Sequence, residues 1–318
     1  MTVKSVFYNQ ERFSIRAGWR ILIFIISMSV FGFATLTLAK AVLAYVPTFD
    51  MQNVRMFFAY LGITLATWFT LRFVDRRPFV SVGLAVNKNS FKELGQGTVL
   101  GFGMMSLIFV AEYSTGMVYI EFFDVTGTAF LQTCAFSVFT YTVVGYGEEL
   151  LFRGYILQAF AEGTNKIIAM LTISILFGFA HASNPNVTPF SIANIVLAGI
   201  WLTVAYYKTN ALWLPIGLHF SWNFTQGFIF SYPVSGTTSL HEQIGTAIQS
   251  GPDWITGGTF GPEGGALATI IIAAGTAFIY YSPWIKESEQ TWKFENWLAS
   301  KKIQQQEISE PLQAGELQ

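Results

Sequence analysis

The chain has 318 residues, of which 52% are hydrophobic and only 12% are charged, against about 25% charged in a typical soluble domain. Several apolar runs reach the roughly 20 residues that an α-helix needs to cross a bilayer, so we predict an all-α, polytopic membrane protein and exclude a soluble enzyme. The net charge of −1 gives no indication of a nucleic-acid partner. The single cysteine, Cys134, excludes an internal disulfide and a cysteine-based metal cluster.

The apolar runs predict about eight membrane spans. In chain order they cover approximately residues 20–45, 55–74, 96–117, 128–150, 166–182, 190–207, 211–230 and 265–282. The fourth is expected to continue as a helix to about residue 161. The first run is long and has no small-residue cleavage site, so it is interpreted as a span and not as a removed signal peptide.

Basic residues are distributed unequally between the two sides of these spans. All but two of the 18 Lys and Arg residues fall on the side of the N-terminus and the tail, the exceptions being Lys40 and Arg55. Cytoplasmic connections carry an excess of Lys and Arg, so we expect this side, with both termini, to be cytoplasmic. The opposite connections are acidic or neutral, which agrees with an even number of spans.

The segments between and after the spans have their own compositions. We expect a single membrane domain over residues 1–284, with a cytoplasmic linker of extended core at 75–95. Residues 231–264 are rich in Gly, Ser, Thr and Pro and predict an external, irregular loop. The polar tail, residues 285–318, is expected to be cytoplasmic and disordered.

Three charges interrupt the apolar sequence in the stretch Gly147–Gly154, which reads GEELLFRG. Charges at membrane depth are costly and usually functional. On a helix, Glu149 and Arg153 share a face and are expected to pair, whereas Glu148 points about 100° away. Glu148 is therefore the carboxylate that could serve as a general base. The alternative is a structural Glu149–Arg153 pair with Glu148 as a bystander at the cytoplasmic edge.

Two of the three histidines also fall in predicted spans. His181 ends the fifth span, and His219 shares a face of the seventh span with Asn223. The third, His241, lies in the external loop and is set aside. A single intramembrane histidine is more often a hydrogen-bonded packing residue than a catalyst, so each carries little weight alone.

The predicted helices bring these polar residues to a similar depth. Glu148 lies about 15 residues before the turn near Gly163 and His181 lies 18 after it, so at 1.5 Å per residue their depths agree to within roughly 6 Å. His219 and Asn223 reach a similar level if the fourth and fifth spans project into the cytoplasm. We expect a wet pocket in the cytoplasmic half of the bilayer.

These groups could together activate a water and stabilise an oxyanion. Glu148 with His181 would take the proton of the water, and His219 with Asn223 would donate hydrogen bonds to the tetrahedral intermediate. Two histidines and a carboxylate could instead bind zinc. However, no H-E-x-x-H helix is present and Asn is a poor zinc ligand, so we favour a site without a metal or other cofactor.

The three motifs together resemble those of a known family. The patterns are Glu148-Glu149-x-x-x-Arg153, Phe177-x-x-x-His181 and His219-x-x-x-Asn223. In this order, in the contexts GEELLFRGYIL, LFGFAHASNP and ALWLPIGLHFSWNF, they are similar to the CPBP intramembrane proteases, also called CAAX proteases, bacteriocin-processing enzymes or the Abi family. The resemblance covers roughly residues 128–230.

The resemblance implies an eight-helix fold and glutamate-dependent hydrolysis of a membrane-associated or lipidated peptide or protein. By motif position, Glu148 would be the base and His181 its partner. His219 and Asn223 would form the oxyanion hole, and Glu149 with Arg153 would support the site. The protein would be integral to the bilayer, in the inner membrane if it is bacterial.

A second hypothesis keeps the same charges without catalysis. Intramembrane acid–base chains also occur in proton-coupled transporters, and some bacterial members of the family could act as immunity or scaffold proteins. Many transporters have internal repeats, and none is detectable in this sequence, which favours the peptidase.

Overall fold

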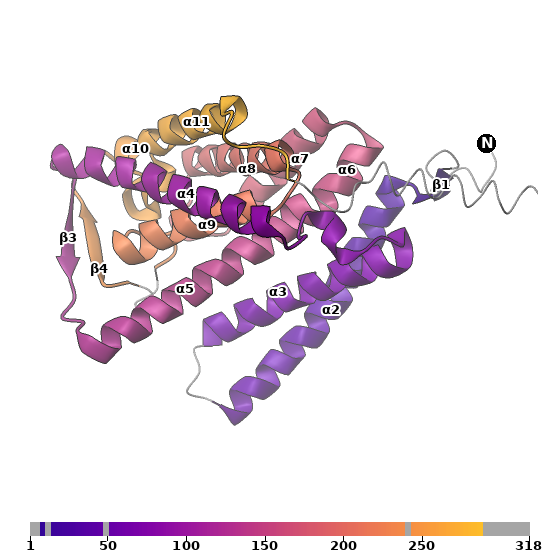
Figure 1. The fold of residues 1–318 in the computed structure, drawn as a ribbon. Helices are drawn as coiled ribbons and strands as arrows, with labels where there is room; N and C mark the ends of the chain where they lie inside the picture. The colour runs from indigo at the N-terminus through magenta and orange to yellow at the C-terminus, as the bar shows by residue number, and fades with distance from the viewer. Residues whose placement is uncertain (1–6, 10–13, 47–50, 239–242, 289–318) are drawn as a thin grey trace, which may run out of the picture.

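The computed structural model describes residues 7–9, 14–46, 51–238 and 243–288. Within them the chain forms a bundle of tilted helices with a two-stranded sheet near each end, which confirms the predicted all-α membrane class (Figure 1). The predictions for His241 and for most of the disordered tail concern residues 239–242 and 289–318, outside the described residues.

Each predicted span corresponds to a helix of the bundle. In chain order these are α2 (Ala17–Tyr45), α3 (Met51–Phe69), α4 (Lys88–Ser114), α5 (Gly127–Glu149), α7 (Lys166–Ala180), α8 (Pro189–Thr209), α9 (Trp213–Phe224) and α11 (Ala266–Tyr281). Three of them continue into π-helical turns: η1 (Thr70–Asp75) after α3, η3 (Leu150–Ile156) after α5 and η4 (Thr225–Ile229) after α9. After η3 the helix runs on as α6 (Leu157–Gly163), as predicted.

Five of these helices are long and apolar enough to cross a membrane: Ala17–Tyr45, Met51–Asp75, Lys88–Ser114, Gly127–Gly163 and Pro189–Thr209. The apolar helices α7 and α11 are shorter, with 15 and 16 residues. The polytopic membrane fold is thus supported, and the number of eight spans stays a prediction.

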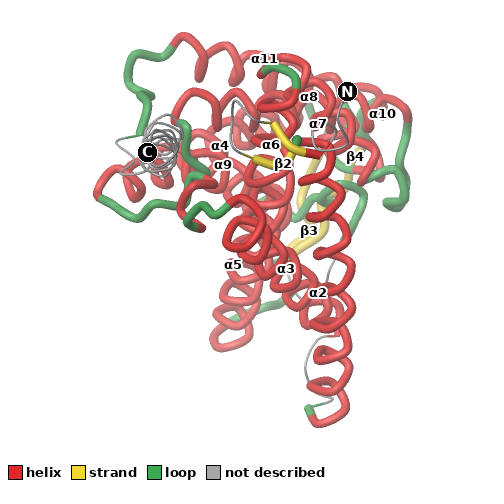
Figure 2. The backbone as a smooth tube through the Cα atoms, turned by 90° about the vertical axis from the view of Figure 1, so that its right-hand side faces the viewer, coloured by secondary structure: helices red, strands yellow, loops and turns green. Residues whose placement is uncertain are grey.

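The helices are arranged around the long α5–α6 helix. The α2–α3 hairpin packs on one side of it, whereas α9 and α4 lie on the other (Figures 1 and 2). Large apolar side chains are exposed on the outer faces, among them Ile26, Phe33 and Leu107 at 55%, 78% and 59% exposure. A bilayer provides the apolar surroundings that such faces need.

Helix α9 is held by an unusually close contact with α4. Gly97 of α4 faces the Leu214 carbonyl, and Gly217 of α9 faces the Leu94 carbonyl, so closely that a methyl group at either glycine would overlap that backbone. Without a hydrophobic force between helices in lipid, such small residues give the van der Waals contact that joins them. The position of α9, which carries two predicted site residues, is therefore fixed by backbone contact.

Local capping signals define where α7 and α8 begin. Asn165 accepts hydrogen bonds from the backbone of Ile167 and Ile168 at the start of α7. Thr188 and Ser191 form a capping box around the start of α8, where Pro189 takes the first position. The segment 181–188 between the two helices is thereby kept short and irregular.

Two connecting segments differ from the sequence-based expectation. The linker 75–95 is not extended, because a 3₁₀ turn, η2 (Phe79–Val82), follows Pro78 and ends at Gly83, which has φ +101°. The loop 231–264 is only partly irregular, since its strand β4 (Gly245–Gln249) pairs antiparallel with β3 (Val118–Phe122). The same loop contains α10 (Asp253–Thr256) and the 3₁₀ turns η5 (Gly258–Phe260) and η6 (Pro262–Gly264).

A buried ionic cluster joins four segments at the end of the bundle where α2 begins. Asp75 accepts hydrogen bonds from Arg20 at 2.7 Å and from Arg77 at 3.0 Å. Both guanidinium groups also contact Glu162 of α6, at 2.5 and 3.2 Å. The Tyr155 hydroxyl donates to the second Asp75 oxygen at 3.3 Å. Two cations and two anions balance, so the cluster closes this end without an unpaired charge.

The Asp75→Asn variant should therefore be less stable than the wild type. Arg20 and Arg77 would keep their positive charges and lose a shared anionic partner in a buried place, at a cost of about 3 kcal/mol. The thermal unfolding midpoint in detergent should fall markedly. As the control, Glu287→Gln changes an exposed carboxylate that contacts Asn210 and should leave the midpoint nearly unchanged. Equal midpoints for the two variants would contradict a stabilising role for the cluster.

Candidate active site

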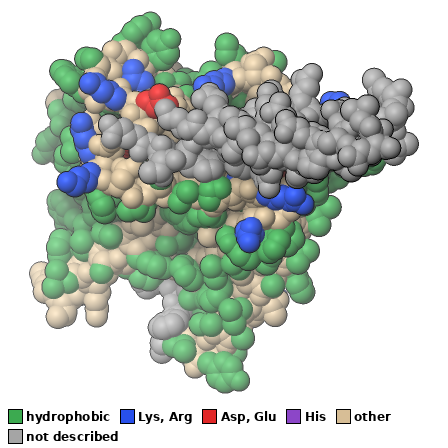
Figure 3. Space-filling model, turned by 45° about the vertical axis from the view of Figure 1, so that its right-hand side comes forward, with side chains coloured by type: hydrophobic (Ala, Val, Ile, Leu, Met, Phe, Trp, Pro, Cys, Tyr) green, Lys and Arg blue, Asp and Glu red, His purple; other side chains and the backbone are tan. Residues whose placement is uncertain are grey.

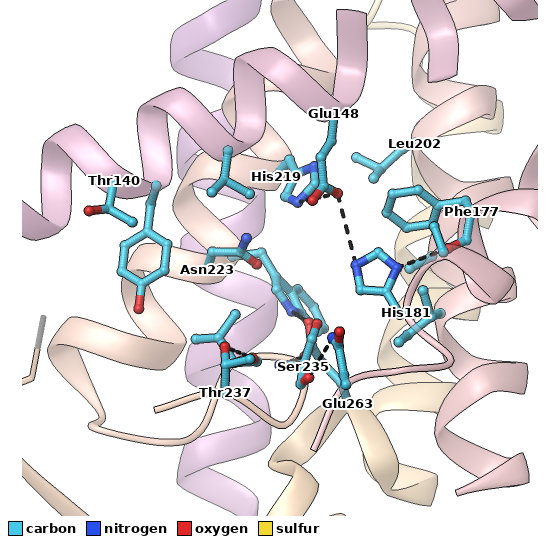
Figure 4. A pocket seen from close by; sticks show the side chains of 18 of the residues that line it. Thr140, Glu148, Phe177, His181, Leu202, His219, Asn223, Ser235, Thr237 and Glu263 are labelled. Atoms are coloured by element: carbon cyan, nitrogen blue, oxygen red, sulfur yellow. Dashed lines mark hydrogen bonds and ion pairs between the residues drawn. The ribbon is translucent and has the colours of Figure 1, made fainter. Parts of the chain in front are cut away.

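The Glu148 carboxylate projects from α5 into a cavity between the helices (Figure 4). Its Oε1 accepts a hydrogen bond from the Tyr60 hydroxyl of α3 at 3.1 Å. Its Oε2 lies 3.8 Å from Nε2 of His219 and 4.0 Å from Nε2 of His181. Among the described residues this oxygen has no hydrogen-bond partner, although it is shielded from solvent. Glu148 is thus an ionisable group that its own helix does not neutralise.

Glu149 and Arg153 form the predicted pair on a neighbouring face of the same helix. Arg153 donates to Glu149 Oε1 at 2.9 Å, and both side chains are fully buried. The guanidinium also donates to the Gly199 carbonyl of α8 at 3.0 Å and lies 4.5 Å above the Phe177 ring of α7. Arg153 therefore links three helices, in addition to balancing one carboxylate.

The motif coincides with a change in helix geometry. α5 ends at Glu149, and the π-helical segment η3 follows from Leu150 to Ile156, with Arg153 in its centre. π-Bulges widen the helix locally and often occur at functional sites. The widened turn lets Arg153 pair with Glu149 while also reaching the α8 backbone.

His181 follows the last residue of α7 and faces Glu148 from the opposite side of the cavity (Figure 4). Its Nδ1 lies 2.9 Å from the Phe177 carbonyl oxygen. Because a carbonyl can only accept, Nδ1 carries a proton and, in the neutral ring, Nε2 presents a lone pair toward Glu148. The rings of Phe177 and His181 contact edge to face, with centroids 5.0 Å apart.

His219 connects the two carboxylates. Its Nδ1 is 2.9 Å from Glu149 Oε1, and its Nε2 is the atom that lies 3.8 Å from Glu148. The sequence indicated that Glu149 would be neutralised within its own helix, whereas the structure adds this second partner from α9. Glu149 thereby fixes the orientation of the imidazole as well as the position of Arg153.

The cavity that contains these groups has a volume of about 390 Å³. Asn223 lines it one helical turn beyond His219, and its side chain lies beside the space between Glu148 and the loop residues (Figure 4). All four predicted catalytic residues thus line one cavity, and the supporting Glu149 and Arg153 lie directly behind it.

Tyr60 is a contact that the sequence did not reveal. It occurs in an apolar run of α3, where nothing in its spacing marks it. A partial signal was Gly147, immediately before Glu148, because a methyl group there would overlap the Tyr60 ring. The missing side chain at Gly147 lets the phenol pass close to α5 and reach the Glu148 carboxylate.

A second unpredicted contribution comes from the loop 231–264. The Glu263 carboxylate accepts hydrogen bonds from the Trp222 indole at 3.1 Å and from the Ser235 backbone and hydroxyl at 2.6 and 2.9 Å. Asn184, in the segment after His181, donates to the Ser235 carbonyl at 2.8 Å. These bonds hold the loop against α9 and close one wall of the cavity.

Within the described part of the chain, no three His, Cys, Asp or Glu side chains are grouped so that they could hold a metal ion. Glu149 Oε1 is occupied by Arg153 and His219, which leaves Glu148, His181 and His219 Nε2 as groups for acid–base chemistry.

Comparison with known proteins gives matches to the same part of the chain. A family model described as "Type II CAAX prenyl endopeptidase Rce1-like" matches residues 130–225, which include every predicted site residue. No solved structure matches the chain with significance.

Two curated relatives come from Bacillus subtilis. "Uncharacterized protein YyaK" is 27% identical over 164 residues, which cover 50% of this chain and 55% of the relative. "Putative membrane peptidase YdiL" is 28% identical over 131 residues, which cover 41% of this chain and 49% of the relative. The chain thus matches about half the length of each. The match over residues 130–225, which contain the three motifs, thus makes the chain similar to the Rce1-like proteins and supports its resemblance to the CPBP family.

Proposed function

We propose that the protein is an intramembrane, glutamate-dependent endopeptidase that cleaves a membrane-associated or lipidated polypeptide. The observation that carries this proposal is the position of Glu148 Oε2, between the Nε2 atoms of His219 and His181 at 3.8 and 4.0 Å in one cavity. The match of residues 130–225 to the Rce1-like family model and the membrane-peptidase name of one relative support the same reaction class.

Glu148 is proposed to be the general base. The distances from its Oε2 to the two histidines are too long for direct hydrogen bonds and suit a water that contacts all three groups. Tyr60 donates to the other oxygen and leaves Oε2 for the water. His181, with its proton on Nδ1, would accept a hydrogen bond from the second O–H of that water at Nε2 and so orient it.

The reaction then needs partners for the developing negative charge. Asn223 can donate its amide N–H to the oxyanion from α9. His219 can donate from Nε2 when its ring is protonated, and such an imidazolium would balance the charges of Glu148, Glu149 and Arg153. This assigns His219 and Asn223 to the oxyanion, with Glu149 orienting the imidazole.

The hydrolysis can be written with these groups alone. The water oxygen attacks the carbonyl carbon as Glu148 takes one proton, and a tetrahedral oxyanion forms. Collapse of this intermediate breaks the C–N bond as Glu148 gives its proton to the leaving amine. The products are a carboxylic acid and an amine, and the base is regenerated without a metal-bound step.

The reacting groups are proposed to lie in the cytoplasmic half of the membrane. If the protein is bacterial, this would be the inner membrane. Glu148 is 15 residues from Gly163 and 21 from Gly127 along one continuous helix, or about 22 and 32 Å at 1.5 Å per residue. Glu148 is therefore closer to the end that the distribution of basic residues predicts to be cytoplasmic.

Replacing Glu148 with Gln should abolish hydrolysis. The amide keeps the size of the side chain and cannot take a proton, so the rate should fall at least about 10²–10⁴-fold. The measurement compares fragments in membrane proteomes from cells that produce the wild type or Glu148→Gln. The control Glu121→Gln changes an exposed carboxylate on β3 and should give the wild-type fragments.

Two results would contradict this reading of the site. If the fragments persist in the Glu148→Gln variant, Glu148 is not the catalytic base, and the buried charges would have a non-catalytic role such as proton-coupled transport. Activity that is lost with a zinc chelator and restored by zinc would require a metal. The proposal expects hydrolysis that a chelator does not change.

Asn223→Ala tests the oxyanion assignment. Loss of one preorganised donor should lower kcat by about 10²–10³-fold and change KM little, because the bond strengthens in the transition state. The matched control is Asn89→Ala, in the first turn of α4, which removes an amide that does not line the cavity. A larger effect on kcat in the control than in Asn223→Ala would refute the assignment.

Gly147→Ala tests the contact between Tyr60 and Glu148. The added methyl group should displace the phenol and lower activity about 10- to 100-fold, the worth of a hydrogen bond to a charged group. Tyr60→Phe should lose a similar factor, and the double variant should lose little more, since both remove one interaction. The control is Gly103→Ala in α4, where a methyl group meets open space. If the losses of activity in Gly147→Ala and Tyr60→Phe added up in the double variant, the two substitutions would not act through one shared interaction.

A further inference from the structure

As the described residues line it, the cavity at Glu148 extends toward one end of the bundle. From Glu148 its lining runs along α5 to Thr140, two turns nearer the start of that helix, and to Asn53 in the first turn of α3. Its rim contains Ser235 and Thr237 of the loop 231–264. The same loop also contains β4, which pairs with β3 at that end of the bundle (Figure 1).

The opposite end is closed by side chains. Immediately beyond the two glutamates, Leu150, Tyr155 and Leu157 of the α5–α6 helix pack with Leu212 at the start of α9, all at 0% exposure. Farther along, the ionic cluster around Asp75 fills the space between α2, η1 and α6. Water and substrate therefore have no comparable route to Glu148 from that end in the described structure.

The sealed end is also the basic end. Among the described Lys and Arg residues, those at this end are Arg16, Arg20, Arg72, Arg76, Arg77, Lys88, Lys92, Lys166, Lys208 and Lys286. Only Lys40 and Arg55 lie toward the open end, and Arg153 lies at the site. Figure 3 shows the basic side chains spread over the end that faces the viewer. The positive-inside rule makes this end cytoplasmic.

We infer that the cavity opens to the extracytoplasmic side and that its substrate is a polypeptide segment presented from that side. That the segment is a substrate rests on the proposed function. The direction in which the cavity opens is argued independently, from the cavity lining, the buried core at the other end and the distribution of basic residues. The reacting groups lie deep in the membrane, toward the cytoplasmic end, at the closed bottom of an outward-facing pocket.

The charges of the lining restrict which segments fit. The described residues that line the cavity include the carboxylates of Glu148 and Glu263 and the imidazoles of His181 and His219, and none of them is Lys or Arg. A segment with carboxylates, including a free C-terminal carboxylate, would enter without a fixed cation to balance it. The pocket therefore favours a neutral or basic juxtamembrane segment that is cleaved internally.

The direction of opening can be measured with cysteine labelling, because the chain has one cysteine to remove. In a Cys134→Ser background, three variants with a single introduced cysteine show from which side of the membrane three different positions can be labelled. Thr237→Cys is exposed on the rim, and Val144→Cys lines the cavity one turn before Glu148. Thr164→Cys is exposed in the turn between α6 and α7 at the sealed end. A small, charged methanethiosulfonate is applied to spheroplasts and to inside-out vesicles, and remaining thiols are counted by mass-tagging.

The inference expects Thr237→Cys and Val144→Cys to react in spheroplasts and Thr164→Cys only in inside-out vesicles. Reaction of Val144→Cys only from the side that labels Thr164→Cys would overturn it, as would no reaction of Val144→Cys from either side. Labelling needs no catalysis, so this outcome is independent of the hydrolysis measured with Glu148→Gln. An outward pocket with no hydrolysis would refute only the proposed function.

Discussion

The buried carboxylate of Glu149 is the feature on which the site depends. A charge inside an apolar bundle is tolerated only when other groups compensate it, and here one oxygen accepts from Arg153 and from His219 at 2.9 Å each. These two partners come from different helices, and Arg153 also binds the α8 backbone at Gly199. Compensation of one charge thus determines how α5, α8 and α9 meet.

This arrangement separates two adjacent glutamates into two roles. Glu149 is fully buried and saturated on one oxygen, whereas Glu148 keeps an oxygen directed at two imidazole rings. The second oxygen of Glu149 also lacks a hydrogen-bond partner among the described residues, but this carboxylate is fully buried and does not line the cavity. The Glu148 carboxylate does line the cavity, and its one direct hydrogen bond among the described residues comes from the Tyr60 hydroxyl on its other oxygen. Successive residues of a helix point about 100° apart, and this difference separates the structural carboxylate of Glu149 from the carboxylate of Glu148 in the cavity.

How much the sequence could predict follows from the kind of contact involved. The Glu149–Arg153 pair and the approach of His181 to Glu148 follow from helix geometry and residue counting, and both were found. Tyr60 and Glu263 were not predicted, because contacts between helices and loops distant in sequence have no spacing rule. The pairing of β4 with β3 was missed for the same reason, since Gly, Ser and Thr in the loop predict turns more strongly than strands.

A hydrolytic site in a membrane must admit water and still keep its charges away from lipid. The bundle meets both conditions by closing the pocket at one end with packed apolar side chains and leaving the other end lined by polar loop residues. Because Glu263 binds Trp222, adjacent to Asn223, the loop that forms the rim is joined to the helix that carries the proposed oxyanion donors. Under the proposed function, a polypeptide segment that displaced this loop would therefore also act on the position of Asn223 through the bond between Glu263 and Trp222.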